Sequence, residues 1–237
     1  MKASDPAPLT EPAEDRRQRK ARQTREALAA AAVGLVLERG LGAVTVEAIA
    51  DRADVTRRTF SRHFGGKEDA ALDFTRTDAD RINAALRARP ASEPPMLAYR
   101  RAVEQWLAEP SAPHLRPHMR ALLAALDTEP ALFAAYERLR VDAQDESVRI
   151  IADRLGTDRD RDLRPAVVVG AAAGVLTAAL RQWARGDGHD TDLADLVGQA
   201  YDALTGEAVL ASAPHPHRNQ RLKPPPAKAG GFLAHVA

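Results

Sequence analysis

Residues 44–64 read VTVEAIADRADVTRRTFSRHF, and this stretch contains the same short pattern, a threonine flanked by apolar residues, twice. Thr45 follows a valine and stands four residues before an isoleucine, and Thr56 follows a valine and stands four residues before a phenylalanine. A threonine hydroxyl caps the first turn of a helix, and apolar residues at this spacing pack across the cap. We therefore predict two short helices, over about 46–52 and 57–64, joined by a short turn as a helix-turn-helix.

The second of these helices separates its aromatic residues from its basic ones. Phe60 and Phe64 recur at a spacing of four, so they share the inner face. The opposite face carries Arg57, Arg58, Ser61 and Arg62. Arginine in a major groove donates two hydrogen bonds to a guanine or bonds phosphate oxygens, and helix N-termini also receive phosphate. The segment is thus predicted to read DNA.

Charge is unevenly distributed along the 237 residues, although the net charge is only +1. Residues 16–67 hold 12 Lys and Arg against 5 Asp and Glu, whereas residues 71–210 hold 17 against 22. A basic N-terminal part joined to an acidic body indicates that only the first part meets a polyanion. The basic arm from Arg16 to Arg25 either binds phosphates or a minor groove, or is a disordered, solvated segment.

Helical periodicity covers most of the remaining chain, and no alternating strand pattern is present. Apolar residues make up 45% of the chain and aromatic residues 4%, which favours a helical core of Ala, Leu and Val. Helices are predicted over about 24–39, 67–89, 95–108, 114–127, 129–155, 162–185 and 191–207, with breaks at prolines and glycines.

These patterns predict an all-α protein with two folded domains. Residues 16–67 form a three-helix, helix-turn-helix DNA-binding domain that includes the basic arm, and residues 68–210 form a second, helical domain. Residues 1–15 and 211–237 are rich in proline and polar residues and are predicted to be disordered.

Several classes of site are not supported by the sequence. The chain has no cysteine, no phosphate-binding glycine loop and no nucleophile-elbow pattern, so we predict no catalytic residues and no cofactor. His114 and His118 are four residues apart, but prolines interrupt their helix and no third ligand completes a metal site. The longest apolar run, 166–180, is shorter than the ~20 residues that span a bilayer, and a cytoplasmic location is expected.

The stretch from about Thr24 to Lys67 resembles the DNA-binding domain of the TetR family of bacterial repressors. The matching residues are Thr24, Arg25, Leu28, Ala31, Ala32, Glu38, Arg39, Gly40, Thr45, Val46, Ile49, Ala50, Ala53, Val55, Thr56, Thr59, Phe60, His63, Phe64 and Lys67. The resemblance implies that the helical domain of residues 68–210 binds a small-molecule effector and joins two copies of the chain as a homodimer. It also implies DNA contacts, mostly to phosphate, from Thr45, Thr56, Arg57, Arg58, Arg62, His63 and Lys67.

Two positions depart from the family pattern. Many members have a tyrosine that contacts phosphate where this chain has Ser61, and a small residue where it has Arg58. The contact implied for Ser61 is therefore weaker than the family pattern suggests. Arg58 either compensates for the missing phenol or shifts the base preference.

The C-terminal part resembles regulators of the mycofactocin-cluster type, because Leu163-Arg164-Pro165 and Arg181-Gln182-Trp183 flank an Ala/Val-rich helix. That helix is apolar nearly all round and is either a dimer contact, as the resemblance implies, or an internal core helix. Candidates for lining a ligand pocket are Trp106, Met119, Leu122, Leu123, Leu126, Phe133, Tyr136 and Trp183, each of which could also be ordinary core. Their apolar character favours a hydrophobic or amphipathic effector, with acyl-CoA as one candidate under the resemblance.

The leading hypothesis is a ligand-responsive DNA-binding transcriptional regulator, a repressor that binds a near-palindromic operator as a dimer. The alternative is a helical small-molecule-binding or enzyme domain without DNA-binding activity. The basic outer face of the second short helix argues against this alternative. An activator is not separated from a repressor by these residues.

Overall fold

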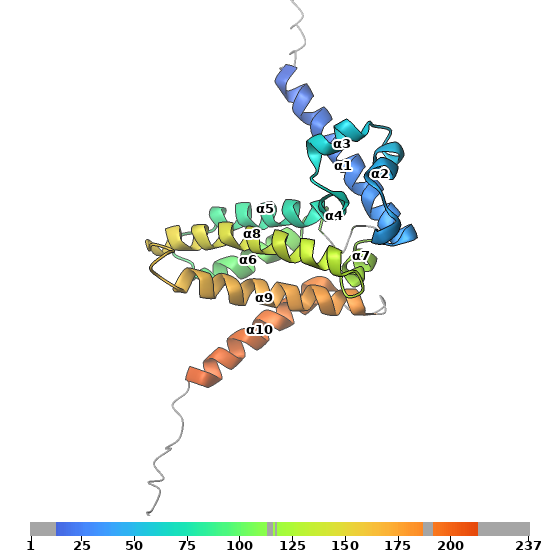
Figure 1. Cartoon of the computed structure of the whole chain (residues 1–237). Coiled ribbons are helices and arrows are strands. Elements are labelled where there is room, and N and C mark those ends of the chain that lie inside the picture. Colours follow the sequence, from blue (N-terminus) through green and yellow to red (C-terminus); the bar gives the residue numbers. More distant parts are fainter. Residues whose placement is uncertain (1–12, 113–115, 117, 187–191, 213–237) are drawn as a thin grey trace, which may run out of the picture.

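The computed structural model describes residues 13–112, 116, 118–186 and 192–212 (Figure 1). Within these ranges the regular structure consists of ten α-helices and one short 3-10 helix, without a strand. The all-α prediction is confirmed for this part of the chain. Those portions of the expected disordered ends that fall on residues 1–12 and 213–237 lie outside the described residues, and so does His114.

The first helix, α1 (Ala13–Arg39), is much longer than the predicted span of about 24–39. The basic arm is therefore helical from its first arginine. No proline interrupts the segment, and its alanines, arginines and glutamines all favour a helix. The helix stops before Gly40, which has a φ of 74°, a left-handed conformation that glycine adopts without strain.

The helix-turn-helix is confirmed and packs against α1. It comprises α2 (Val46–Arg52) and α3 (Arg57–His63), preceded by the 3-10 turn η1 (Leu41–Ala43). Ile49 and Phe60 are almost fully buried against the apolar stripe of α1. The stripe consists of Leu28, Ala31, Ala32, Leu35 and Val36, all buried as their spacing predicted.

The helix predicted over 67–89 is divided into α4 (Lys67–Ala71) and α5 (Asp73–Ala88). The break falls at Leu72, whose side chain is completely buried. No glycine or proline marks this position, so no local signal predicts the break. It coincides with a side chain whose place is set by tertiary packing.

The body is a helical bundle in which α9 lies at the centre of the contacts. It consists of α5, α6 (Pro95–Leu107), α7 (Met119–Ala125), α8 (Pro130–Leu155), α9 (Arg164–Arg185) and α10 (Leu193–Ser212). Helix α9 packs against α6, α7, α8 and α10, and Figure 1 shows α10 leaving the bundle at an angle. Among the described helices, α9 is the one long and apolar enough to cross a membrane, and it packs against four other helices of the bundle on one side.

Two boundaries in the body differ from the predicted ones. Helix α7 begins at Met119 rather than at about 114, because His118 before it has a left-handed φ of 66° that no helix can contain. Helix α10 continues to Ser212, two residues into the segment that was expected to be disordered.

Candidate nucleic-acid interface and internal cavity

Both threonine caps form as the sequence predicts. The Oγ1 of Thr45 accepts a hydrogen bond from the Ala48 N–H at 3.1 Å, and the Oγ1 of Thr56 accepts one from the Thr59 N–H at 3.2 Å. Both threonines are exposed, so each cap lies at the surface of the domain. A cap of this kind contributes about 1 kcal/mol, which matters for helices of only seven residues.

The outer face of α3 presents the predicted basic residues to solvent. Arg57, Arg58, Ser61 and Arg62 are all exposed. Arg57 forms an ion pair with Glu47 of α2, with 3.0 Å between Nη1 and Oε1. Arg58 and Arg62 have no ion-pair partner within the described residues, so their guanidinium groups are available to an outside anion.

Lys67 and His63 lie differently from what the family resemblance implied. The ammonium of Lys67 donates to the carbonyl oxygens of Leu41 at 2.7 Å and of Val44 at 2.9 Å, so it holds the turn that precedes α2. The Nε2 of His63 is buried without a hydrogen-bond partner among the described residues. Burial, together with the charges of nearby arginines, holds the pKa of His63 below its usual value. The positions of these two side chains favour structural roles.

Arg25, the last member of the basic arm, also faces inward. Its Nε and Nη2 donate to one carboxylate oxygen of Asp73 at 2.9 and 2.6 Å, and its Nη1 donates to the His63 carbonyl at 2.8 Å. The guanidinium stacks 4.4 Å from the centre of the Phe64 ring. Arg25 thus joins α1, the end of α3 and the start of α5. The exposed charges of the arm are those of Arg16, Arg17, Lys20 and Arg22.

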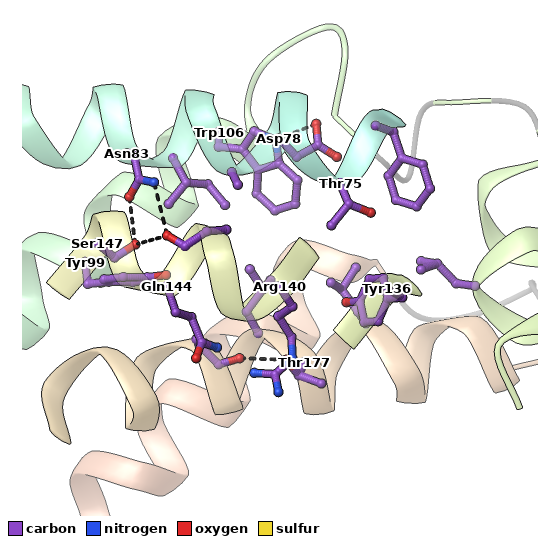
Figure 2. Close-up of a pocket in the computed structure, with 18 residues that line it drawn as sticks. Thr75, Asp78, Asn83, Tyr99, Trp106, Tyr136, Arg140, Gln144, Ser147 and Thr177 are labelled. Atoms are coloured by element: carbon purple, nitrogen blue, oxygen red, sulfur yellow. Dashed lines mark hydrogen bonds between the residues drawn. The ribbon is translucent and has the colours of Figure 1, made fainter. Parts of the chain in front are cut away.

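The body contains a cavity of about 90 Å³ between α5, α6, α8 and α9 (Figure 2). Of the residues proposed to line a ligand pocket, Trp106, Leu123 and Tyr136 line this cavity. Phe133 and Leu126 line a smaller neighbouring pocket instead. The remaining candidates, Met119, Leu122 and Trp183, are buried core residues outside both linings, and the Trp183 ring lies under Arg120.

The surface of the cavity is mostly apolar, as the prediction of a hydrophobic or amphipathic effector assumed, but polar side chains also line it. The polar residues that line it are Thr75, Asp78, Asn83, Arg140, Gln144, Ser147 and Thr177. Their helical spacing was the signal that could have revealed them. Asp78 stands four residues before Ile82 and eight before Leu86, and it therefore falls on the buried stripe of α5.

Asp78 is the most buried charged residue of the cavity wall. Its Oδ1 accepts from the Trp106 indole N–H at 3.3 Å and from the Arg116 guanidinium. Burial raises the pKa of Asp78, and the hydrogen bond from Arg116 opposes that shift. Arg116 belongs to the connection between α6 and α7, so this bond ties the connection to the cavity wall.

Besides the Arg25–Asp73 pair, two polar contacts made by α8 and the residue before it connect the body to the DNA-binding part. A carboxylate oxygen of Glu129, just before α8, accepts from the Leu41 N–H at 3.4 Å. The Nη2 of Arg138 in α8 lies 3.4 Å from the Oδ1 of Asp69 in α4. Since α8 also lines the cavity, a displacement of this helix would reach the DNA-binding domain through both contacts.

Comparisons with known proteins agree with this arrangement. The family model described as bacterial regulatory proteins, tetR family, matches residues 28–71, and the model described as the MftR C-terminal domain matches residues 93–208. The HTH-type transcriptional regulator TcmR of Streptomyces glaucescens is 37% identical over 172 residues, which cover 70% of this chain and 76% of TcmR.

Solved structures show the same fold. A TetR-family transcriptional regulator from Mesorhizobium loti matches with a TM-score of 0.51 and 18% identity, over 81% of this chain and 97% of its own. SmeT, the repressor of the Stenotrophomonas maltophilia multidrug efflux pump SmeDEF, matches with a TM-score of 0.50 and 20% identity, over 78% of this chain and 91% of its own. At these identities the likeness concerns the fold alone.

Proposed function

Because the chain belongs to the TetR family of bacterial regulatory proteins, we propose that it is a ligand-responsive repressor that binds a near-palindromic operator as a homodimer. Members of the family are transcriptional regulators rather than enzymes, and they bind DNA and act as dimers with small-molecule effectors. The observation that carries the proposal is the exposed basic face of α3, whose N-terminus is capped by Thr56 and whose partner helix α2 is capped by Thr45.

In the proposed complex α3 occupies the major groove. Arg58 and Arg62 supply the free guanidinium groups, and Arg57 reaches phosphate after it exchanges its surface pair with Glu47. Such an exposed pair is worth at most about 1 kcal/mol, so the exchange is inexpensive. Ser61 reaches less far than a tyrosine would, which leaves more of the phosphate binding to the arginines.

The dimer is proposed to form through α9 and α10. Helix α9 exposes a stripe of small and apolar residues at helical spacing, namely Val167, Gly170, Gly174 and Ala178. A Cβ atom built on either glycine meets nothing within 4 Å in the single chain, so space is open there for a second copy. An exposed apolar stripe of this kind on a helix is typical of a protein–protein contact.

The repressor role and the response to a ligand have separate support. SmeT, which shares the fold, is a repressor. The internal cavity supplies a place for an effector, and α8 runs from its wall to the contacts with the DNA-binding domain. An effector that binds better to a conformation with mismatched recognition helices shifts the population away from the DNA-bound form. Because its target is the bacterial chromosome, we propose a cytoplasmic location.

Selection from a random double-stranded DNA library with the full chain tests the DNA-binding part of the proposal. We expect enrichment of one near-palindromic site. Arg58→Ala should lower affinity for that site by roughly 1–3 kcal/mol, whereas Arg161→Ala, an exposed arginine of the body, should leave it unchanged. Selection without a shared palindrome, or equal loss in both variants, would contradict the proposal.

A reporter gene with the selected site at its promoter tests the direction of regulation. Expression of the protein should lower reporter output, and Arg58→Ala should restore it. A rise in output with the wild-type protein would show activation and would overturn the repressor assignment.

A further inference from the structure

The residues that line the cavity extend along several turns of two helices. The lining follows α5 from Phe74 to Asn83 and α8 from Tyr136 to Ser147. At 1.5 Å per helical residue these stretches measure roughly 14 and 16 Å. Figure 2 shows Tyr136 and Thr75 toward one end and Asn83, Ser147 and Gln144 toward the other. A ligand that follows the wall must therefore be elongated.

Aromatic side chains are concentrated in this wall. The chain has only ten aromatic residues, and four of them, Phe74, Tyr99, Trp106 and Tyr136, line the cavity. Rings prefer edge-to-face or offset contacts with other rings, so a wall of this composition favours a ligand that contains rings.

The two charged residues of the wall are already neutralised by the protein. Asp78 accepts from Arg116 and Trp106, and Arg140 donates to Glu137, with 2.6 Å between Nη2 and Oε2. A ligand charge placed among these groups would lose its hydration without gaining an unpaired counter-charge. The wall therefore favours an uncharged ligand.

Two polar atoms of the wall have no partner. The Oγ1 of Thr75 and the Nε2 of Gln144 are buried and make no hydrogen bond within the described part of the chain. Buried polar groups are nearly always hydrogen-bonded in folded proteins, so each of these marks a place where a ligand atom or water is needed. Thr75 can donate or accept, whereas the Gln144 Nε2 can only donate.

We propose that this cavity takes an uncharged, elongated aromatic molecule with a hydrogen-bonding group near each end. One group meets the hydroxyl of Thr75, and the other, an acceptor, receives the amide N–H of Gln144. The inference rests on the proposed ligand response and names the class of its effector. Since 90 Å³ is less than the roughly 300 Å³ of small-molecule pockets, binding must widen the cavity between α5 and α8.

Three rod-shaped probes with the same skeleton test this class: 4,4′-dihydroxybiphenyl, biphenyl and biphenyl-4,4′-dicarboxylate. Each is titrated into the full chain, and binding is followed by isothermal titration calorimetry. We expect the diol to bind and the dicarboxylate to bind at least about tenfold more weakly, because the wall offers it no free positive charge.

The variants Thr75→Val and Gln144→Leu test the two end contacts. Each should lower the preference for the diol over biphenyl by about three- to tenfold, the usual effect of one hydrogen bond. Thr75→Ser keeps the hydroxyl and should keep the preference, which separates this contact from a folding defect. Thr77→Val and Gln105→Leu alter exposed residues of α5 and α6 and serve as matched controls.

The ligand class is overturned if the dicarboxylate binds as tightly as the diol, if the diol does not bind, or if both variants keep the wild-type preference. The proposed ligand response has its own readout, which is the affinity for the selected operator. A diol that binds through both contacts without weakening operator binding would overturn that response and leave the ligand class standing. Release of the operator by an unrelated charged compound, without release by the diol, would support the ligand response and overturn the ligand class.

Discussion

Replacement of Arg25 by methionine should destabilise the DNA-binding domain more than any other change in the basic arm. The guanidinium makes three hydrogen bonds and stacks on Phe64 at the point where α1, α3 and α5 meet. Its side chain is 32% exposed and that of Asp73 is 11% exposed, so solvent screens the pair only in part. Methionine keeps the packed alkyl stem and removes the donors.

The magnitude follows from these contacts. Hydrogen bonds to a charged partner contribute about 1.5–3 kcal/mol, and a partly exposed stack on an aromatic ring adds about 0.5–1 kcal/mol. With partial screening, Arg25→Met should lower the free energy of unfolding by about 2–3 kcal/mol. Asp73→Asn should lower it by less, because the Arg25 bond to the His63 carbonyl and the ring stack remain.

Urea unfolding of the two single variants and the double variant, followed by far-UV circular dichroism, measures the coupling. We expect the double variant to be more stable than additive losses would give, by about 1–2 kcal/mol, because both single changes remove the same pair. Additive effects, or an Arg25→Met protein within about 0.5 kcal/mol of the wild type, would refute the role assigned to this junction.

Three further predictions concern the dimer, the histidine and the arm. A Cβ atom at Gly174 meets nothing within 4 Å in the single chain, so Gly174→Leu should leave the fold intact but weaken the dimer at least about tenfold, and an unchanged sedimentation profile would contradict the α9 contact. Because the pKa of His63 is lowered in the folded protein, the unfolded chain binds the proton more readily; stability should therefore fall as the pH drops below about 6.5. In urea unfolding at several pH values, the free energy of unfolding of His63→Gln should fall less with decreasing pH than that of the wild type. An equal fall in the two proteins would show that His63 is not the group responsible. Deletion of residues 1–20 removes five basic residues, four of them in the arm, and should flatten the salt dependence of operator binding, by a slope of about 0.9 for each lost phosphate contact; an unchanged slope would show that the deleted part does not touch DNA.

The helix-turn-helix could be predicted because its signals are local. Thr45 and Thr56 each carry a cap and a flanking apolar pair within five residues, and the structure confirms both helices. The break at Leu72 could not be predicted, since it depends on a side chain buried by distant elements. The inward position of Lys67 could not be predicted either, because the carbonyl oxygens that it binds lie more than twenty residues away in the sequence.

The cavity was predicted only in part for a related reason. A search for large apolar residues finds Trp106 and Tyr136 but passes over Thr75 and Gln144, whose polarity suggests a surface position. Only the folded arrangement shows that these two face an interior space. Met119 and Trp183 fit the same apolar criterion but are ordinary core residues. Hydrophobicity predicts that a residue is buried, and it does not distinguish a residue that lines a cavity from one packed in the solid core.

Because α1 is one unbroken helix, a small rotation at one of its ends produces a larger displacement at the other. Its 27 residues form one rod of roughly 40 Å, whose C-terminal end lies beside the Glu129 contact with the body. A tilt of about 5° at that end would move the opposite tip by about 3 Å, comparable to the length of a hydrogen bond. A small displacement near the cavity would thus become a larger one at the N-terminal end of α1, where the exposed arginines of the basic arm lie.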